Sequence, residues 1–309
     1  MSKFVNQLEK TLLDQGKSQS TIKTYMNRLR KLNNDKNPTS LKFLRDIDNV
    51  KKYFEDKKFT VASKKSFIGS IVTILKASSK KIDNVAVEKY KNFLSKDELD
   101  SISNDKKSQK QKDNWLSWDE VLEIKKKLKQ KAVISSQEDQ VNKNEYNLLL
   151  DNLVLSFYVN LAPRRSKDFA IMKIQQPNEK LNDTNNYLTL ENHLVFNDYK
   201  TDKKYGKQEI DISKNEELME DLNLYLMHRK EQENEFNLLL KFNGRRFNEI
   251  NDITRILNNI FKKNVSVNML RAIYITDKFA ENKNQMEETA SDMGHSVSVQ
   301  QGIYNKKDN

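Results

Sequence analysis

The chain has 309 residues, of which 36% are hydrophobic and 32% charged, and its net charge is +11. A chain of this length is expected to form two domains. Cysteine is absent, which excludes a disulfide framework, a thiolate metal site and a cysteine nucleophile. With three histidines, no long apolar run and no signal-peptide core at the N-terminus, we expect a soluble intracellular protein that needs neither a metal nor a cofactor and does not cross a membrane.

The excess positive charge lies in the N-terminal part of the chain. Residues 1–115 hold 26 Lys and Arg against 14 Asp and Glu, whereas residues 116–309 hold 29 against 30. A compact segment with this excess favours a polyanionic partner, because each neutralised phosphate releases counterions. On charge alone, a merely solubilising lysine-rich surface explains the pattern equally well.

Residues 1–100 show the apolar spacing of several short helices. Ile22, Tyr25 and Leu29 recur at helical intervals behind the N-cap candidates Ser20 and Thr21. The segment thus predicts a small helical bundle with basic outer faces. Its polar continuation, SISNDKKSQKQKDN, has the composition of a linker, which we place at 101–115.

The second domain, 116–309, is predicted to be mainly α-helical with a small antiparallel β-sheet. It opens on a capping box, Ser117 with Glu120, and contains a helix from Glu145 to Asn160 that is apolar on nearly every face. A second Ser-x-x-Glu box begins at Ser213 and predicts a return to helices. Three short runs alternate like strands: Tyr187–Leu190, His193–Phe196 and Glu209–Ser213.

Five short motifs of this domain combine residues suited to phosphate chemistry. Two arginines at the end of an apolar helix, as in PRRSKDF, are unusual unless they point into a cleft. Each motif alone is weak, since a hairpin lysine is usually solvated and a C-terminal tyrosine usually packs. In chain order the motifs are PRRSKDF with Arg165 and Asp168, YKT with Lys200, NMLR with Asn268 and Arg271, MGHS with His295, and finally Tyr304.

In this order the motifs resemble those of the tyrosine recombinases, or phage-type integrases. MGHSVSVQQGIY is similar to the family's histidine box, which ends nine residues later in a tyrosine. PRRSKDF resembles the first arginine box, in which the acid stands three residues after the arginine, so the match selects Arg165 with Asp168. The variants PRRSKDF and YKTDKKYG look most like those in integrases of virophages and related large-DNA-virus elements.

The resemblance implies a helical core-binding domain at 1–100, which binds DNA, followed by a catalytic domain at 116–309. It implies that the protein integrates or recombines double-stranded DNA for a virus or mobile element. The reaction would pass through a 3′-phosphotyrosine intermediate. A homo-tetramer located at DNA would carry it out. Arg165 and Arg271 would clamp the scissile phosphate, and planar guanidinium groups suit its oxygens because they stay charged and donate in pairs.

The resemblance also assigns roles to the remaining residues. Tyr304 would be the nucleophile, Lys200 the general acid for the leaving 5′-hydroxyl, and His295 a hydrogen-bond partner of the phosphate. Asp168 would orient the cluster rather than react. Lys203 and Lys204 are alternatives to Lys200, although contact with the DNA backbone suits them better.

One position departs from the family pattern, which usually has histidine where this chain has Asn268. An amide donates a hydrogen bond to phosphate but does not shuttle a proton near neutral pH. His295 could then accept the tyrosine proton. Two alternatives stay open: a type IB topoisomerase-like enzyme, which shares the order of motifs, and a catalytically impaired DNA-binding protein of the same fold. A β-rich N-terminal domain would favour the topoisomerase.

Overall fold

A computed structural model describes residues 3–78, 81–100, 107–137, 140–230, 236–247 and 251–292. The chain divides into two compact units, Met1–Lys107 and Ser108–Asn309, each continuous in sequence and each with its own apolar core. The predicted fold class, mainly α with a small sheet, is confirmed. None of the helices in the described ranges combines the length and apolarity that a bilayer crossing requires.

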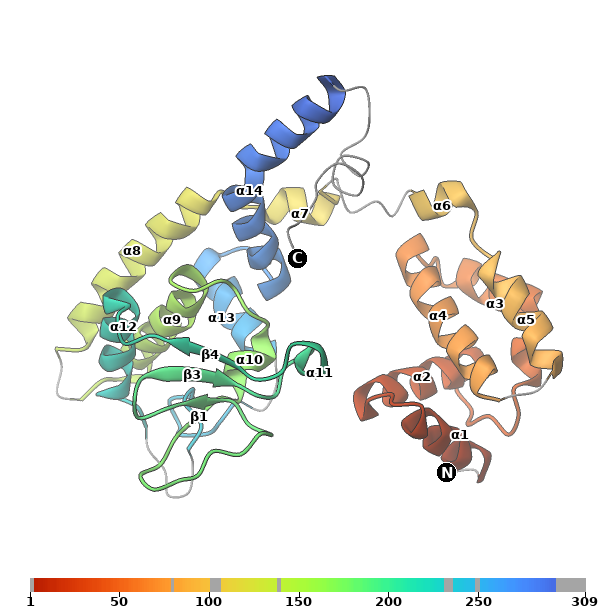
Figure 1. Cartoon of the computed structure of the whole chain (residues 1–309), viewed down its shortest axis with the longest axis horizontal. Coiled ribbons are helices and arrows are strands. Elements are labelled where there is room, and N and C mark those ends of the chain that lie inside the picture. The colour runs from red at the N-terminus through yellow and green to blue at the C-terminus, as the bar shows by residue number, and fades with distance from the viewer. Residues whose placement is uncertain are drawn as a thin grey trace, which may run out of the picture. The chain divides into compact units, whose positions relative to one another are not determined.

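In its described residues the first unit consists of helices joined by turns and loops, with no strand (Figure 1). Its core is built from the apolar stripes of packed helices, with Leu12, Leu44 and Phe54 fully buried. Arg28 joins α2 to α4 through the Ser66 carbonyl oxygen and lies over the Phe67 ring. The elements are α1 (Lys3–Asp14), α2 (Gln19–Leu32), the 3-10 helix η1 (Lys42–Leu44), α3 (Ile47–Asp56), α4 (Val61–Ala77), α5 (Lys81–Lys91) and α6 (Lys96–Asp100).

The second unit packs helices around the buried α9, next to a four-stranded sheet (Figure 1). Its helices are α7 (Gln109–Asn114), α8 (Trp118–Ser135), α9 (Lys143–Val159), α10 (Ser166–Ala170), α11 (Asp202–Tyr205), α12 (Glu216–Leu226), α13 (Asn251–Phe261) and α14 (Val267–Asp292). Its strands are β1 (Lys173–Ile174), β2 (Tyr187–Leu188), β3 (His193–Phe196) and β4 (Gln208–Asp211).

The sheet is mixed, which corrects the prediction of a purely antiparallel one. The strand order is β1-β2-β3-β4, with β1 parallel to β2 and the other pairs antiparallel. The prediction missed β1 because two residues are too short to show an alternating pattern. In the β3–β4 register Phe196 pairs with Gln208, so the connection that carries Lys200 leaves the sheet at this pair.

Helix caps show where local sequence rules succeed and fail. The capping box of Ser117 and Glu120 is present at the start of α8. Ser18, rather than Ser20 or Thr21, caps α2. The cap of α12 is Asn215. The predicted box at Ser213 does not form, because that hydroxyl donates to Asp211 instead.

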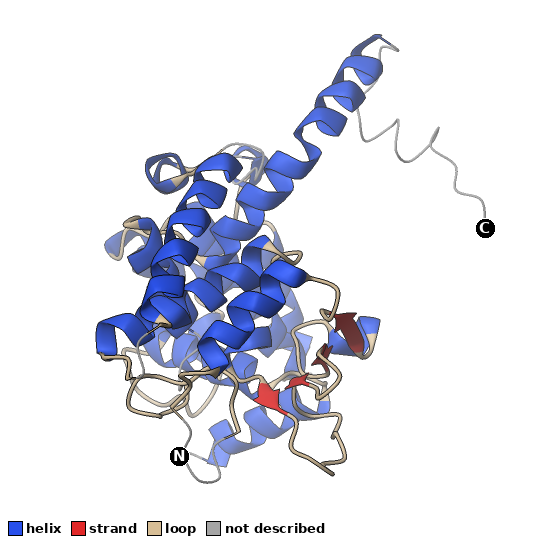
Figure 2. Cartoon of the chain, turned by 90° about the vertical axis from the view of Figure 1, so that its left-hand side faces the viewer, coloured by secondary structure: helices blue, strands red, loops and turns tan. Residues whose placement is uncertain are grey.

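Helices α7 and α14 lie near the beginning and at the end of the described residues of the second unit. Within the expected linker 101–115, residues 109–114 form α7, which Ser108 and Gln111 stabilise with a capping box. Helix α14 has 26 residues, and only its beginning packs on the core, where Leu270 and Ile273 are buried. Its later part extends away from the rest of the unit and exposes Ile275 and Phe279 (Figures 1 and 2).

Candidate functional site

The first arginine motif forms the turn between α9 and α10. Arg165 is the N-cap of α10 in extended backbone conformation, and its carbonyl oxygen accepts from the Asp168 amide at 3.0 Å. Phe169 is fully buried and stacks on Phe157 of α9 with ring centroids 4.5 Å apart. The short helix is therefore anchored through its apolar side, which fixes the backbone of the two arginines that precede it.

Arg164, not Arg165, is the ion-pair partner of Asp168. The Arg164 Nε donates to Asp168 Oδ2 at 2.9 Å, and both side chains are largely buried. The guanidinium of Arg165 has no ion pair or hydrogen bond with any residue in the described ranges, so its donors are available to a ligand. Of the two neighbouring arginines, Arg164 is therefore the one held by the protein, and the role of Arg165 at a phosphate stays a prediction.

Arg271 reaches the same turn from α14. Its Nε donates to the Pro163 carbonyl oxygen at 3.1 Å, a contact across 108 residues of sequence. Burial lowers the pKa of Arg271, and the nearby positive charge of Arg165 lowers it further. The exposed Asn268, one turn earlier in α14, accepts a long hydrogen bond of 3.5 Å from Arg271.

The charges in this cluster do not balance. Three guanidinium groups, those of Arg164, Arg165 and Arg271, lie around the single carboxylate of Asp168, whose pKa is raised by burial although Arg164 and Arg165 oppose that shift. Asp168 Oδ1 and the Tyr158 hydroxyl are buried and form no hydrogen bond within the described part of the chain. Burial and the Asp168 charge raise the pKa of Tyr158 above its ordinary range. A half-buried site with surplus positive charge is suited to an anion.

Lys200 lies on the exposed connection between β3 and β4, which contains α11. The base of this connection is fixed to α10 by Asn186, whose amide donates to the carbonyl oxygens of Asp168 and Asp198, each at 3.0 Å. The side-chain Oδ1 of Asn186 accepts from the backbone amide of Asp198 at 2.8 Å. Lys200 is thus carried by a loop whose starting point is attached to the arginine turn.

The structure therefore brings together four of the predicted site residues: Arg165, Asp168, Asn268 and Arg271. His295 and Tyr304 lie outside the described residues. Sequence reasoning missed Arg164 and Tyr158 as members of the cluster. The four-residue spacing of Arg164 and Asp168 is the signal that could have suggested their pair, although Arg164 lies before the N-cap of α10 and not on the helix itself. Tyr158 stands in an apolar run and gives no such signal.

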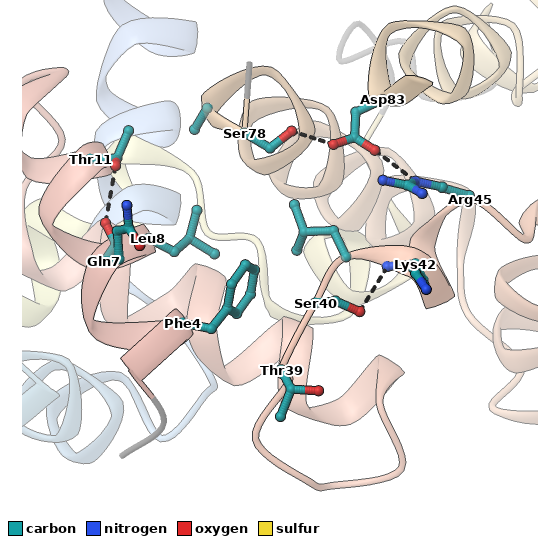
Figure 3. A pocket seen from close by; sticks show the side chains of 12 residues that line it. Phe4, Gln7, Leu8, Thr11, Thr39, Ser40, Lys42, Arg45, Ser78 and Asp83 are labelled. Carbon is teal, nitrogen blue, oxygen red and sulfur yellow. Dashed lines mark hydrogen bonds and ion pairs between the residues drawn. The ribbon is translucent and has the colours of Figure 1, made fainter. Parts of the chain in front are cut away.

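Two further features of the structure have the general form of a site. Within the described ranges no three His, Cys, Asp or Glu side chains are grouped so as to hold a metal ion. The first unit contains a hollow of about 550 Å³ between α1, η1 and the end of α4 (Figure 3). Asp83 at its edge accepts from Arg45 Nε at 2.8 Å with one carboxylate oxygen and from the Ser78 hydroxyl with the other (Figure 3). This carboxylate is fully engaged, so it offers nothing to a ligand.

Comparisons with known proteins identify no family. No family model and no curated protein matches the sequence. Among solved structures, the chain is similar to the crystal structure of XerA recombinase, with a TM-score of 0.34 and 17% sequence identity over 99% of this chain and 94% of that one. Likeness at this level supports no inference about fold or function.

Proposed function

We propose that this protein is a site-specific tyrosine recombinase that cleaves and rejoins DNA strands. The observation that carries the proposal is the surplus of positive charge around Asp168, where three guanidinium groups face one carboxylate. A phosphodiester brings one negative charge, and its pentacoordinate transition state concentrates further negative charge on the equatorial oxygens. The surplus therefore stabilises the more negative transition state more than the bound phosphodiester, which is the condition for catalysis.

The free donors indicate how the phosphate binds. Among the described residues no group occupies the donors of Arg165, and Arg271 uses Nε for Pro163 and directs only a long contact to Asn268. Both would bind the non-bridging oxygens, while the amide of Asn268 donates a further hydrogen bond. Removing one such preorganised donor costs about 3–4 kcal/mol in the transition state of comparable sites.

The remaining steps involve Lys200, His295 and Tyr304. The Tyr304 oxygen forms a bond to phosphorus as the bond to the 5′ oxygen breaks, giving a 3′-phosphotyrosine that conserves the bond energy for rejoining. The Lys200 ammonium gives its proton to the leaving oxygen, and His295 accepts the tyrosine proton in place of the histidine that Asn268 replaces.

Double-stranded DNA is the proposed partner, and the basic first unit supplies non-specific affinity for its backbone. Exchange between two duplexes requires four strand cleavages, which we assign to a homo-tetramer acting at DNA, in integration of a viral or mobile element. A β-rich N-terminal domain would favour a type IB topoisomerase. The described residues of the first unit form helices and no strand, which supports a recombinase instead.

The proposal is tested with a nicked suicide DNA substrate and denaturing gel electrophoresis. The wild type is expected to form a covalent protein–DNA adduct, and Tyr304→Phe none. Tyr205→Phe is the matched control, because this exposed tyrosine lies on the Lys200 connection and should leave adduct formation unchanged. An adduct that persists in Tyr304→Phe, or its absence from the wild type, would contradict the proposal.

Two further measurements separate the alternatives. If Asn268 weakens catalysis, Asn268→His cleaves the same substrate faster than the wild type. A protein that binds DNA but forms no adduct in either form is the impaired variant of the fold. Relaxation of supercoiled plasmid irrespective of sequence would instead indicate the topoisomerase.

A further inference from the structure

Arg164 connects the arginine turn to the loop that carries Lys200. Its Nε donates to Asp168 Oδ2 at 2.9 Å, on α10. Its Nη1 donates to Gln208 Oε1 at 2.7 Å, at the first residue of β4. One guanidinium group thus joins the acid behind the phosphate clamp to the strand on which the Lys200 connection ends.

The same guanidinium also packs on the start of that connection. Its central carbon lies 3.8 Å from the ring centroid of Phe196, the last residue of β3, and 5.1 Å from that of Tyr199, which immediately precedes Lys200. Both rings are buried, and the Tyr199 hydroxyl donates to the Gly206 carbonyl oxygen at 2.6 Å, which closes the loop. Arg164 therefore touches both ends of the connection.

These contacts leave Arg164 unsuited to bind the phosphate itself. Its side chain is 16% exposed, and its Nε and Nη1 are already bonded to Asp168 and Gln208. A planar guanidinium group held by two acceptors and covered by aromatic rings has little freedom to turn towards a ligand. Its contribution to the reaction must then come from the positions of the groups that it holds.

We propose that Arg164 is a positioning residue that sets the location of Lys200 relative to the phosphate held by Arg165 and Arg271. The inference rests on the proposed function, in which Lys200 protonates the leaving 5′ oxygen as the phosphorus–oxygen bond breaks. Proton transfer requires hydrogen-bond reach. A small displacement of the loop therefore removes general-acid catalysis by Lys200, while Arg165 and Arg271 still bind the phosphate.

A substrate whose bridging 5′ oxygen is replaced by sulfur distinguishes this role from damage to the clamp. The thiolate leaving group needs no proton, because the pKa of a thiol is about 8.5. Lys200→Ala is expected to slow cleavage of the ordinary substrate about 100-fold, the lower range for a general acid, and to cleave the sulfur substrate at a nearly normal rate. Arg164→Leu should show the same rescue by sulfur.

Three further variants test whether the loss of activity reflects general misfolding. Gln208→Ala removes the hydrogen bond from Arg164 to β4 and keeps the pair of Arg164 with Asp168. We expect it to slow cleavage of the ordinary substrate about tenfold, the effect of losing one charge-assisted hydrogen bond. The sulfur substrate should restore the rate. Gln208→Glu retains an acceptor and should stay close to the wild type. Arg45→Leu breaks the comparable arginine–aspartate pair of the first unit and should not alter the ratio of the two rates.

Hydrogen exchange provides a readout that does not depend on activity. Backbone amides of 197–207 should exchange faster in Arg164→Leu than in the wild type or Arg45→Leu. Equal losses on both substrates, or unchanged exchange in the loop, would overturn the inference and leave the recombinase proposal intact. A wild type that forms no adduct with either substrate would instead defeat the recombinase proposal, and the exchange experiment would still decide whether Arg164 holds the loop.

Discussion

Each unit of the molecule contains a buried aspartate paired with an arginine, and the two pairs have opposite surroundings. Asp83 uses both oxygens, on Arg45 and Ser78, and no second arginine is part of its contacts in the described ranges. Asp168 uses one oxygen on Arg164, leaves the other without a hydrogen bond there, and lies beside two further arginines. A pair in which both carboxylate oxygens are bonded, as at Asp83, holds helices together. A buried aspartate with one oxygen unbonded and several arginines beside it, as at Asp168, has a surplus of positive charge that suits an anion.

The largest expected effect comes from removing each aspartate in turn. Asp168→Asn and Asp83→Asn each leave a partly exposed arginine without its counterion, which we expect to lower the free energy of unfolding by at most about 3–5 kcal/mol, the loss for a fully buried pair. Sulfate should restore more stability to Asp168→Asn, because an anion can replace the lost charge only where other arginines converge. Both tryptophans, Trp115 and Trp118, lie in the second unit, so their fluorescence follows Asp168→Asn and circular dichroism follows Asp83→Asn.

Sulfate stabilises folded proteins in general by exclusion from their surfaces, so the difference between the two variants is the quantity that matters. An equal response to sulfate in both would show that the arginines around Asp168 bind no anion, and the contrast between the two pairs would lose its functional meaning.

A third acid, Asp151 of α9, extends the comparison to a carboxylate that forms no ion pair with any other residue that the structure describes. Burial raises the pKa of Asp151 to about 7, although Lys262 opposes the shift. Because the folded pKa exceeds the ordinary value of 3.8, stability is greatest when the group is protonated and falls as the pH rises towards 7. Asp151→Asn should therefore raise the free energy of unfolding at pH 8 by roughly 2–4 kcal/mol and leave it unchanged near pH 4.

Urea unfolding followed by tryptophan fluorescence at both pH values checks this expectation. A gain of equal size at pH 4 would mean that the amide packs better than the carboxyl, independently of charge.

The smallest effect concerns an exposed pair on the sheet. His193 Nδ1 lies 2.5 Å from Glu209 Oε1, and this hydrogen bond, aided by Asp211, raises the pKa of His193 above 6.5. The pair's contribution is complete below the unfolded pKa of the histidine and is lost as the pH rises through the folded value. Solvent screens such a pair, so only a slight change in stability is expected.

The titration of His193 by nuclear magnetic resonance gives the direct measurement. Its midpoint should lie above 6.5 in the wild type and fall in Glu209→Gln. A midpoint that does not respond to this substitution would show that the pair does not form in solution.

The sequence predicted features that depend on neighbouring residues and missed those that depend on distant ones. The box of Ser117 and Glu120 could be predicted because cap and acceptor are three residues apart. The parallel β1 could not, because its two residues acquire strand geometry only from pairing with Tyr187 and Leu188. At the site, motif spacing selected Arg165 and Arg271, but the link from Arg164 to Gln208 spans 44 residues and has no local signal.

The contact between Arg271 and Pro163 also has a consequence for the order of assembly. During synthesis the first unit, continuous in sequence, emerges well before α14 and can fold alone. The arginines of the α10 turn are synthesised about a hundred residues before Arg271. Repulsion between their positive charges and that of Arg271 opposes the docking of α14 onto the turn. Anion-binding capacity should therefore appear late in refolding, and DNA present at that stage should speed the docking of α14 by neutralising the charges that resist it.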